Sequence, residues 1–365
     1  MRKRGRTGFS VRPRSLSGPG PGPCPPRGRG RAVFLLCVRA VFEPRGPAPG
    51  SQGCPGSPPR PCSNVTPVTS EITLFVNPTA GRGRGAGAAQ PAARVLREAG
   101  YSVRTVLGED APDALRRARE AVAGGTGALI AVGGDGLVSL ALQAVAGTPT
   151  PLGVVAVGTG NDFARSLRLP VRDPAAAARI AADALKGGGG REIDLGRAGD
   201  RWFGTVLASG FDSRVSERGN RMGRLAGRFT YEAALLAELA ALRPVPYRLT
   251  LDGGRTRDVE AILIAVGNGD SYGGGMRICA GAVLDDGLLD VIVVAACSRT
   301  TLLRVFPRVY RGTHLDHPKV TVYRARSVAL AAEGLTGWAD GERVGPLPLT
   351  AECVPGAVRV LAHRE

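Results

Sequence analysis

The chain has 365 residues, 43% of them hydrophobic, and is therefore long enough for two globular domains with buried cores. Its formal net charge of +17 is uneven, because residues 1 to 70 contribute +11 and the remainder only +6. The cysteines at 279, 297 and 353 lack CxxC spacing and the three histidines do not cluster with them, which argues against a zinc site and favours a reduced, cytoplasmic setting.

Residues 1 to 69 are predicted to be a disordered extension rich in proline, glycine and arginine. The first 70 residues hold 14 of the 28 prolines, and 12 Lys and Arg against one acid, Glu43. Such a composition cannot bury enough surface to offset chain entropy. The apolar patch at residues 31 to 42 is too short for a membrane span, is broken by Arg39 and does not make a convincing signal peptide. Alternatively, translation begins near Val65 or Val68.

Residues 70 to 196 are predicted to form an α/β domain. Apolar runs predict strands at residues 72 to 78, 128 to 134 and 151 to 158, and an alternating pattern predicts a strand at residues 101 to 107. Helical stretches lie between them, at residues 88 to 100, from Asp110 onward, and from Leu137 onward. This alternation predicts a parallel sheet with helices on both faces, which places ligands at the carboxyl ends of the strands.

Residues 197 to 354 are predicted to form a mainly antiparallel β-sandwich domain. Short strand-like runs separated by turn residues follow one another, and only one clear helix interrupts them, around residues 221 to 242. The last strand, at about residues 355 to 365, is predicted to return to the first domain. The expected fold class is therefore α/β followed by antiparallel β.

Three glycine-rich loops follow strands of the first domain. NPTAGRGRG (77 to 85) offers backbone N–H groups and positive charge that suit a phosphate, or is a plain connection. GGDG (133 to 136) lets a nucleotide approach the backbone while Asp135 acts on a metal or phosphate-bound ion, or is a hairpin turn. GTGNDF (158 to 163) repeats this logic with the Thr159 hydroxyl, and Asn161 or Asp162 could cap the next helix.

Five motifs in order and spacing resemble the diacylglycerol kinase catalytic family, in particular its soluble bacterial lipid kinases. These are NPTAG, GGDG, GTGNDFAR, LDDGLLDV (284 to 291) and DGE (340 to 342), and the match covers residues 71 to about 362. The resemblance implies a two-domain fold. It also implies transfer of the γ-phosphate of ATP to the hydroxyl of diacylglycerol or a related lipid, giving phosphatidic acid or its equivalent.

The resemblance assigns roles to individual residues. Asp135 and Asp162 would lie near the phosphates or the metal, and Glu342 would be the general base that the attacking hydroxyl requires. The LDDG loop would bind a structural Mg²⁺ through Asp286 and the carbonyls of Val283 and Leu288. From the residues alone, Asp286 could equally lie in a solvated hairpin and Glu342 in a surface turn. The residues implied to contact ATP are Asn77, Pro78, Thr79, Ala80, Gly81, Gly133, Gly134, Asp135, Gly136, Thr159 and Asn161.

The chain departs from the family after GGDG. The family has threonine, a hydrophobic residue, asparagine and glutamate there, whereas this chain has Leu137, Val138, Ser139 and Leu140. If Leu137 replaces a group that donates a transition-state hydrogen bond, the rate would fall by roughly 10²- to 10³-fold. A catalytically impaired nucleotide- or lipid-binding sensor or scaffold is therefore one alternative function. An NAD kinase-like enzyme, which shares GGDG, is another, although GTGNDF and LDDG argue against it.

The expected partner is a lipid substrate at the inner face of the membrane, reached by a cytoplasmic enzyme without a transmembrane segment. Arg218, Arg221, Arg224 and Arg228 form a basic stripe beside apolar residues within residues 218 to 244, which either meets anionic lipid or is a solvated helix face. The basic extension, if translated, would add nonspecific attraction to membrane or nucleic acid. No motif predicts specific nucleic-acid binding, and a homodimer is left open.

Overall fold

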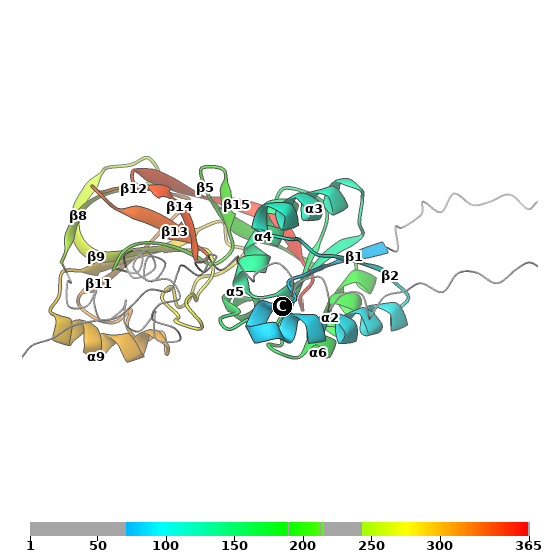
Figure 1. The fold of residues 1–365 in the computed structure, drawn as a ribbon. Coiled ribbons are helices and arrows are strands. Elements are labelled where there is room, and N and C mark those ends of the chain that lie inside the picture. The colour runs from blue at the N-terminus through cyan, green and yellow to red at the C-terminus, as the bar shows by residue number, and fades with distance from the viewer. Residues whose placement is uncertain (1–70, 189, 212–213, 215–242, 364–365) are drawn as a thin grey trace, which may run out of the picture. The chain divides into compact units, whose positions relative to one another are not determined.

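The structure, a computed structural model, describes residues 71 to 188, 190 to 211, 214 and 243 to 363 (Figure 1). All of them belong to one compact unit, Val65–Glu365. The disordered extension predicted for residues 1 to 69, the helix predicted around 221 to 242 and all four arginines of the basic stripe lie outside the described residues.

A four-stranded parallel sheet with helices on both faces occupies the first half, as predicted. Its strands lie in the order β2-β1-β3-β4. Helices α3, α4 and α5 pack on one face, and α2 and α6 on the other (Figure 1). The elements are β1 (Glu71–Val76), α2 (Ala80–Glu98), β2 (Ser102–Val106), α3 (Ala111–Ala123), β3 (Ala128–Gly133), α4 (Asp135–Val145), β4 (Leu152–Ala156), α5 (Asp162–Ser166) and α6 (Pro174–Lys186).

Strands β1, β3 and β4 of the sheet are buried on both faces, which explains their continuous apolar runs, whereas the edge strand β2 is largely exposed. Along β3, Leu129 and Ala131 face one layer of helices, while Ile130 and Val132 face the other. Each strand of this kind must be apolar at every position. The alternation that marks a half-exposed strand is therefore absent from β3.

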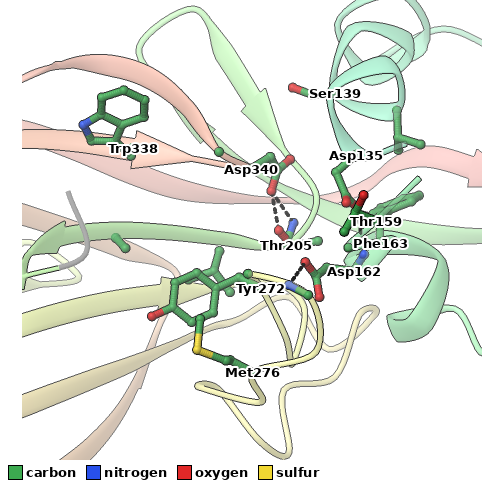
Figure 2. A pocket seen from close by; sticks show the side chains of 17 residues that line it. Asp135, Ser139, Thr159, Asp162, Phe163, Thr205, Tyr272, Met276, Trp338 and Asp340 are labelled. Atoms are coloured by element: carbon green, nitrogen blue, oxygen red, sulfur yellow. Dashed lines mark hydrogen bonds between the residues drawn. The ribbon is translucent and has the colours of Figure 1, made fainter. Parts of the chain in front are cut away.

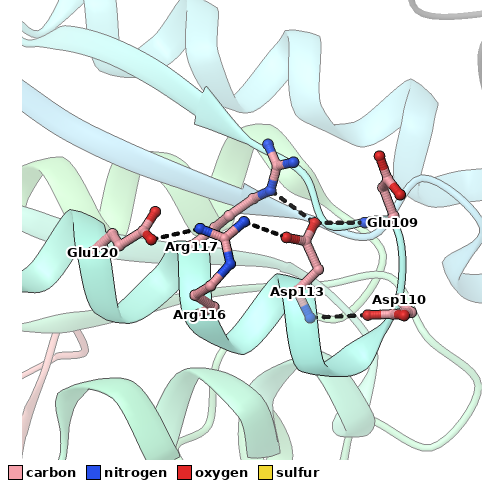
Figure 3. Close-up of polar contacts among 6 residues, drawn as sticks. All are labelled: Glu109, Asp110, Asp113, Arg116, Arg117 and Glu120. Atoms are coloured by element: carbon pink, nitrogen blue, oxygen red, sulfur yellow. Dashed lines mark hydrogen bonds and ion pairs between the residues drawn. The ribbon is translucent and has the colours of Figure 1, made fainter.

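Helix α3 begins at a cap that the sequence indicates. The Asp110 carboxylate accepts the Asp113 N–H at 2.9 Å, and Pro112 follows within the first turn. Asp113 in turn accepts from the Glu109 N–H and pairs with Arg116 and Arg117 (Figure 3). These contacts, the Glu109 N–H first, lower the pKa of Asp113 to about 2. Arg116 and Arg117 are exposed, so the network contributes little to folding stability.

The second half is an antiparallel, sandwich-like β structure, which confirms the predicted fold class. Its strands enclose one apolar core, to which Leu207 on β7, Leu249 on β8 and Val291 on β10 contribute. The strands are β5 (Arg191–Ala198), β6 (Arg201–Phe203), β7 (Val206–Gly210), β8 (Val245–Leu251), β9 (Arg257–Gly267), β10 (Leu289–Ala295), β11 (Val320–Ala325), β12 (Ser327–Ala331), β13 (Thr336–Ala339), β14 (Glu342–Pro346) and β15 (Leu349–Val360).

Strand β15 joins the two halves. It pairs antiparallel with β5 and β12, and its last residue, Val360, pairs parallel with Leu152 of β4. The sequence suggested two separate strands here, but they are one, with a register shift between Val354 and Val358 opposite β5. The domain boundary near residue 196 stays a prediction and falls within β5.

One helix of the second half escaped the sequence analysis. Helix α9 (Arg299–Val309) packs on the outer face of β9 and β10 (Figure 1). Two threonines in its first turn and Pro307 near its end lower its helix propensity. Its signals are the Ser298 cap, which accepts the Thr301 N–H, and its apolar inner residues. Within the described part of the chain, every helix is too short or too polar to span a bilayer.

Candidate active site

The three glycine-rich loops of the first domain meet at the carboxyl edge of its sheet. Asn77 donates its N–H to the Val132 carbonyl at 3.1 Å, and Val157 donates to that of Gly133 at 2.9 Å. A Cβ on Gly158 would lie only 2.5 Å from the Gly134 Cα. The loops after β3 and β4 therefore approach each other closely because both positions are glycine.

The first loop is shaped by its asparagine. The Asn77 Oδ1 accepts the Thr79 N–H at 3.0 Å and the Thr79 hydroxyl at 2.8 Å. Gly81, Arg82 and Gly83 follow in the left-handed region, and a Cβ on Gly81 would lie 2.0 Å from the Val157 carbonyl oxygen. This run of left-handed residues turns the chain tightly into α2. Pro78 and Ala80 lie in the same turn, half-buried.

Asp135 lies in the first turn of α4, so GGDG is a strand-to-helix junction and the hairpin alternative is wrong. Its carboxylate accepts the Asn161 N–H at 2.6 Å and the Asp162 N–H at 2.7 Å. Those are the first donors of α5, and neither Asn161 nor Asp162 caps that helix with its side chain as expected. Asp135 caps it from the neighbouring loop and so fixes the position of Asp162.

Asp162 connects the first half of the chain to the second. Its two carboxylate oxygens accept the N–H groups of Gly274 and Gly275, at 2.8 and 2.7 Å. Both glycines have positive φ, 86° and 104°, which other residues rarely adopt. Burial raises the pKa of Asp162; the Gly274 N–H opposes this shift and the nearby Asp135 adds to it.

Asp340 is a functional candidate that the sequence analysis did not name. It lies in the turn between β13 and β14 at a φ of 51°, and its carboxylate accepts the N–H groups of Gly204 and Thr205 at 2.8 and 2.9 Å. The Thr205 hydroxyl also donates to it, at 2.5 Å. Burial raises the pKa of Asp340 against these hydrogen bonds, of which the Thr205 hydroxyl has the largest effect. A half-buried acid with three hydrogen-bond donors is unusual in a tight turn, and the DG pair was the available signal.

Asp135, Asp162 and Asp340 line one cavity of about 370 Å³ (Figure 2). The first two come from the parallel half, while Asp340 comes from the antiparallel half. Thr159 and Ser139 add hydroxyls from the first half, and Tyr272, Met276 and Trp338 add apolar surface from the second. The cavity thus places three acids beside the glycine-rich loops and next to an apolar wall.

The residues after GGDG have separate locations. Leu137 is 6% exposed and belongs to the core between α4 and the sheet, and Leu140 packs against the same core. Ser139 is buried at the cavity and accepts a hydrogen bond from Arg201 at 3.3 Å. In this chain residue 137 thus faces the core, and Ser139 supplies a hydroxyl at the cavity. The effect of the departure on the rate stays a prediction.

The LDDG loop lies between β9 and β10. The Asp286 carboxylate accepts the Leu288 N–H at 3.0 Å and pairs with the Arg324 guanidinium, while Val283 is exposed. Buried Asp194 supports the loop by accepting the Gly287 N–H at 2.7 Å. Among the described residues, no three His, Cys, Asp or Glu side chains are grouped to hold a metal ion.

The donors of this loop nevertheless fit Mg²⁺ in kind. Mg²⁺ binds oxygen ligands, often through one or two carboxylates, and keeps several waters. Asp286 offers such a carboxylate, and its pairing with Arg324 shows that its position is suited to balancing a positive charge. The assignment of Asp286, Val283 and Leu288 as ligands stays a prediction.

Glu342 lies just outside the cavity. It is the first residue of β14, is exposed, and is not among the described residues that line the cavity, whereas Gly341 and Asp340 are. Its role as general base stays a prediction. A chain of hydrogen bonds does reach this turn from the LDDG side: the Asn268 amide donates to the carbonyls of Asp194 and Gly204, and the Gly204 N–H donates to Asp340.

Comparison with known proteins identifies the family. A diacylglycerol kinase catalytic domain model matches residues 71–198, and a YegS C-terminal NAD kinase beta sandwich-like domain model matches residues 205–362. A diacylglycerol kinase of Mycobacterium tuberculosis (strain CDC 1551 / Oshkosh) is 45% identical over 299 residues, which are 80% of this chain and 96% of that protein. The chain belongs to the diacylglycerol kinase family. The resemblance drawn from the five motifs is thereby confirmed.

Two further matches agree with this family. A diacylglycerol kinase of Staphylococcus aureus (strain MRSA252) is 30% identical over 279 residues, covering 75% of this chain and 87% of that protein. The crystal structure of a putative diacylglycerol kinase from Bacillus anthracis str. Sterne superposes with a TM-score of 0.68. It is 24% identical and covers 83% of this chain and 98% of that one, so it supports the fold. Diacylglycerol kinases of this family are lipid kinases, which makes the chain a kinase-family enzyme.

Proposed function

We propose that this diacylglycerol kinase-family chain transfers the γ-phosphate of ATP to the hydroxyl of diacylglycerol or a related lipid. The observation that carries the proposal is the cavity in which Asp135, Asp162 and Asp340 converge from both halves of the chain. Parallel sheets bind phosphates at the carboxyl ends of their strands, where these glycine-rich loops lie. The apolar wall on the other side suits a lipid.

The nucleotide is proposed to bind along the loops of the parallel half. The backbone of residues 77 to 81 and 133 to 136, together with Thr159 and Asn161, would hold its phosphates. Thr159 lines the cavity and is exposed there, and Asn161 is buried with its Nδ2 donating to the Gly158 carbonyl. Arg84 donates to the carbonyls of Val157 and Gly158 and so holds the first loop against the third.

The acidic residues are proposed to have different roles in the reaction. Glu342 would take the proton from the acceptor hydroxyl as the oxygen of that hydroxyl attacks the γ-phosphorus. The bond between the γ-phosphorus and the bridging oxygen of the β-phosphate then breaks, and ADP leaves. Asp340, two residues away, would position this turn by holding the Gly204 and Thr205 backbone. Asp135 and Asp162 would lie near the phosphates. Mg²⁺, when bound, supplies charge neutralisation for the phosphates, and Asp286 would hold a structural ion.

Leu137 gives no support to the alternative of an impaired sensor or scaffold, because its side chain lies in the core. The loop that lacks the family threonine keeps the Ser139 hydroxyl at the cavity. No observation of the site favours NADH or NAD⁺ as the acceptor over a lipid, and the apolar wall of Tyr272, Met276 and Trp338 favours the lipid.

The test is transfer of radiolabel from [γ-³²P]ATP by the full chain, with Mg²⁺, to lipids in mixed micelles. Diacylglycerol, monoacylglycerol and a long-chain base are offered in parallel, and the products are separated by thin-layer chromatography. We expect labelled phosphatidic acid, and its loss in Glu342→Ala. Transfer no higher than that of Glu342→Ala, with ATP binding intact by calorimetry, would contradict the proposal and favour the impaired alternative.

A further inference from the structure

Helix α9 has one face buried and one face that the described residues leave exposed. Leu302, Phe306 and Val309 pack with Ile292 and Val294 on the sheet below. The opposite side is called here the α9 outer face. Its residues recur every three or four positions along the sequence, as expected for one side of a helix. It consists of the exposed residues Arg299, Leu303, Arg304, Pro307, Tyr310 and Arg311.

This face exposes large apolar side chains to an unusual degree. Leu303 is 56% exposed and Tyr310 49%. Val322 on β11 is 40% exposed and points to the same side of its strand as Val320, which packs under α9. Only one other large apolar side chain of the described residues, Val283, is as exposed as these three. Exposed apolar side chains gathered on one side mark an interaction surface.

The charge of the same segment is entirely positive. Residues 291 to 315 contain four arginines and no aspartate or glutamate. The Arg308 guanidinium donates to the Thr313 carbonyl, whereas the guanidinium groups of Arg299, Arg304 and Arg311 have no hydrogen-bond or ion-pair partner among the described residues. Three guanidinium groups therefore remain available to an anionic surface.

Apolar side chains interspersed with arginines on one helix face suit the boundary between lipid headgroups and acyl chains. Leucine and tyrosine can enter the headgroup region while guanidinium groups contact the phosphates. A basic surface lacking such apolar groups would suit nucleic acid, and an apolar one lacking arginines would suit a second protein. The combination therefore favours an anionic bilayer over either alternative.

Helix α9 lies close to the apolar side of the candidate active site. Val305, Phe306 and Val309 line an almost wholly apolar hollow of about 50 Å³ under the helix. Two further residues of that hollow, Tyr272 and Met276, also line the cavity of the three acids. The apolar hollow therefore connects the inner side of α9 with the apolar wall of the candidate active site.

We propose that the α9 outer face docks the protein on anionic lipid bilayers. Leu303 and Tyr310 insert among the headgroups, and Arg299, Arg304 and Arg311 bind their phosphates. The biological role of this docking, which is to bring the enzyme to its lipid substrate, rests on the proposed lipid kinase function. The docking itself requires no catalysis. It also acts separately from any attraction that the basic residues 1 to 69 exert.

The experiment measures co-sedimentation of the full chain with phosphatidylcholine vesicles, with and without phosphatidylglycerol. The test variant combines Arg304→Ala and Arg311→Ala. The matched control combines Arg119→Ala and Arg179→Ala, which removes the same charge from exposed helix positions in the first half. Both keep residues 1 to 69, so their difference reports on α9 alone. Circular dichroism verifies that all variants are folded.

We expect the Arg304→Ala and Arg311→Ala double variant, called here the α9 pair, to bind the anionic vesicles about 25-fold more weakly than the unaltered chain, at about five-fold per arginine. The control variant should change this binding much less. Leu303→Ser should weaken binding further, and added salt should weaken it for every form. Equal binding by the α9 pair and the control would overturn the proposal. So would a dimer of the unaltered chain that Leu303→Ser dissociates, because α9 would then contact a second copy.

A separate measurement tests the proposed kinase function independently of the docking. Transfer of phosphate by the unaltered chain to water-soluble dihexanoylglycerol requires no bilayer. If that transfer is absent while the α9 pair still loses vesicle binding, the docking surface stands and the kinase proposal does not.

Discussion

Replacing Asp340 tests whether a half-buried acid organises the candidate active site. Its carboxylate accepts two backbone N–H groups and the Thr205 hydroxyl. Each buried donor left without an acceptor costs about 1–3 kcal/mol, less where water from the cavity can replace the carboxylate. Alanine at a φ of 51° costs about 1–2 kcal/mol more. Removing a buried charge offsets part of this, so we expect Asp340→Ala to lower the free energy of unfolding by about 2–4 kcal/mol.

Asp340→Asn separates the charge from the shape of the side chain. Asparagine tolerates a positive φ and keeps one acceptor, so its cost should be about 1–2 kcal/mol. Because the folded-state pKa of Asp340 is raised above the ordinary value of 3.8, its stabilising contribution is complete below that pH and is lost as the pH rises through the folded-state pKa. The advantage of the wild type over Asp340→Asn should therefore grow as the pH is lowered from neutral.

The assay is urea unfolding followed by circular dichroism at several pH values, together with the phosphate-transfer rate. We expect transfer to fall by about 10²-fold in Asp340→Ala, because the loop at Gly204 and Thr205 loses its anchor. Asp200→Ala, which removes an exposed turn aspartate in the same half, is the control. Unfolding of Asp340→Ala at the same urea concentration as Asp200→Ala would refute the reasoning.

Three further predictions concern other parts of the site. Leu137→Thr should lower the free energy of unfolding by about 2–3 kcal/mol without raising the transfer rate, because residue 137 lies in the core; a faster enzyme would contradict this. Gly275→Ala should destabilise by about 1–3 kcal/mol, because alanine is strained at a φ of 104°, and should loosen the contact with Asp162; an unchanged melting temperature would contradict it. Mg²⁺ should raise the melting temperature of the wild type and EDTA should reverse this, with neither effect in Asp286→Asn; an equal Mg²⁺ shift in Asp286→Asn would place the ion elsewhere.

Local patterns predicted the parallel half well. Its inner strands β3 and β4 are apolar throughout because both faces are covered, and its helices begin at caps such as Asp110. The same patterns located the glycine-rich loops at one edge of the sheet, because parallel strands end on the same side. The antiparallel half was predicted as a class, but α9 was missed because its stability comes from packing on Ile292 and Val294 and not from helix propensity.

The buried acids could not be assigned from the sequence because their partners are distant along the chain. Asp340 is held by residues 204 and 205, and Asp162 by residues 274 and 275. In the sequence each resembles an ordinary turn or cap residue. The orientation of Leu137 was equally inaccessible, because it depends on α4 beginning at Asp135, which turns residue 137 toward the core.

The central claim is that the cavity of the three acids is where phosphate is transferred. The most direct measurement is the initial rate of ³²P transfer from ATP to diacylglycerol by Asp135→Asn, beside Asp200→Asn as an exposed control. We predict that Asp135→Asn loses about 10²-fold or more in rate while remaining folded, and that Asp200→Asn keeps the wild-type rate. A wild-type rate in Asp135→Asn would contradict the account.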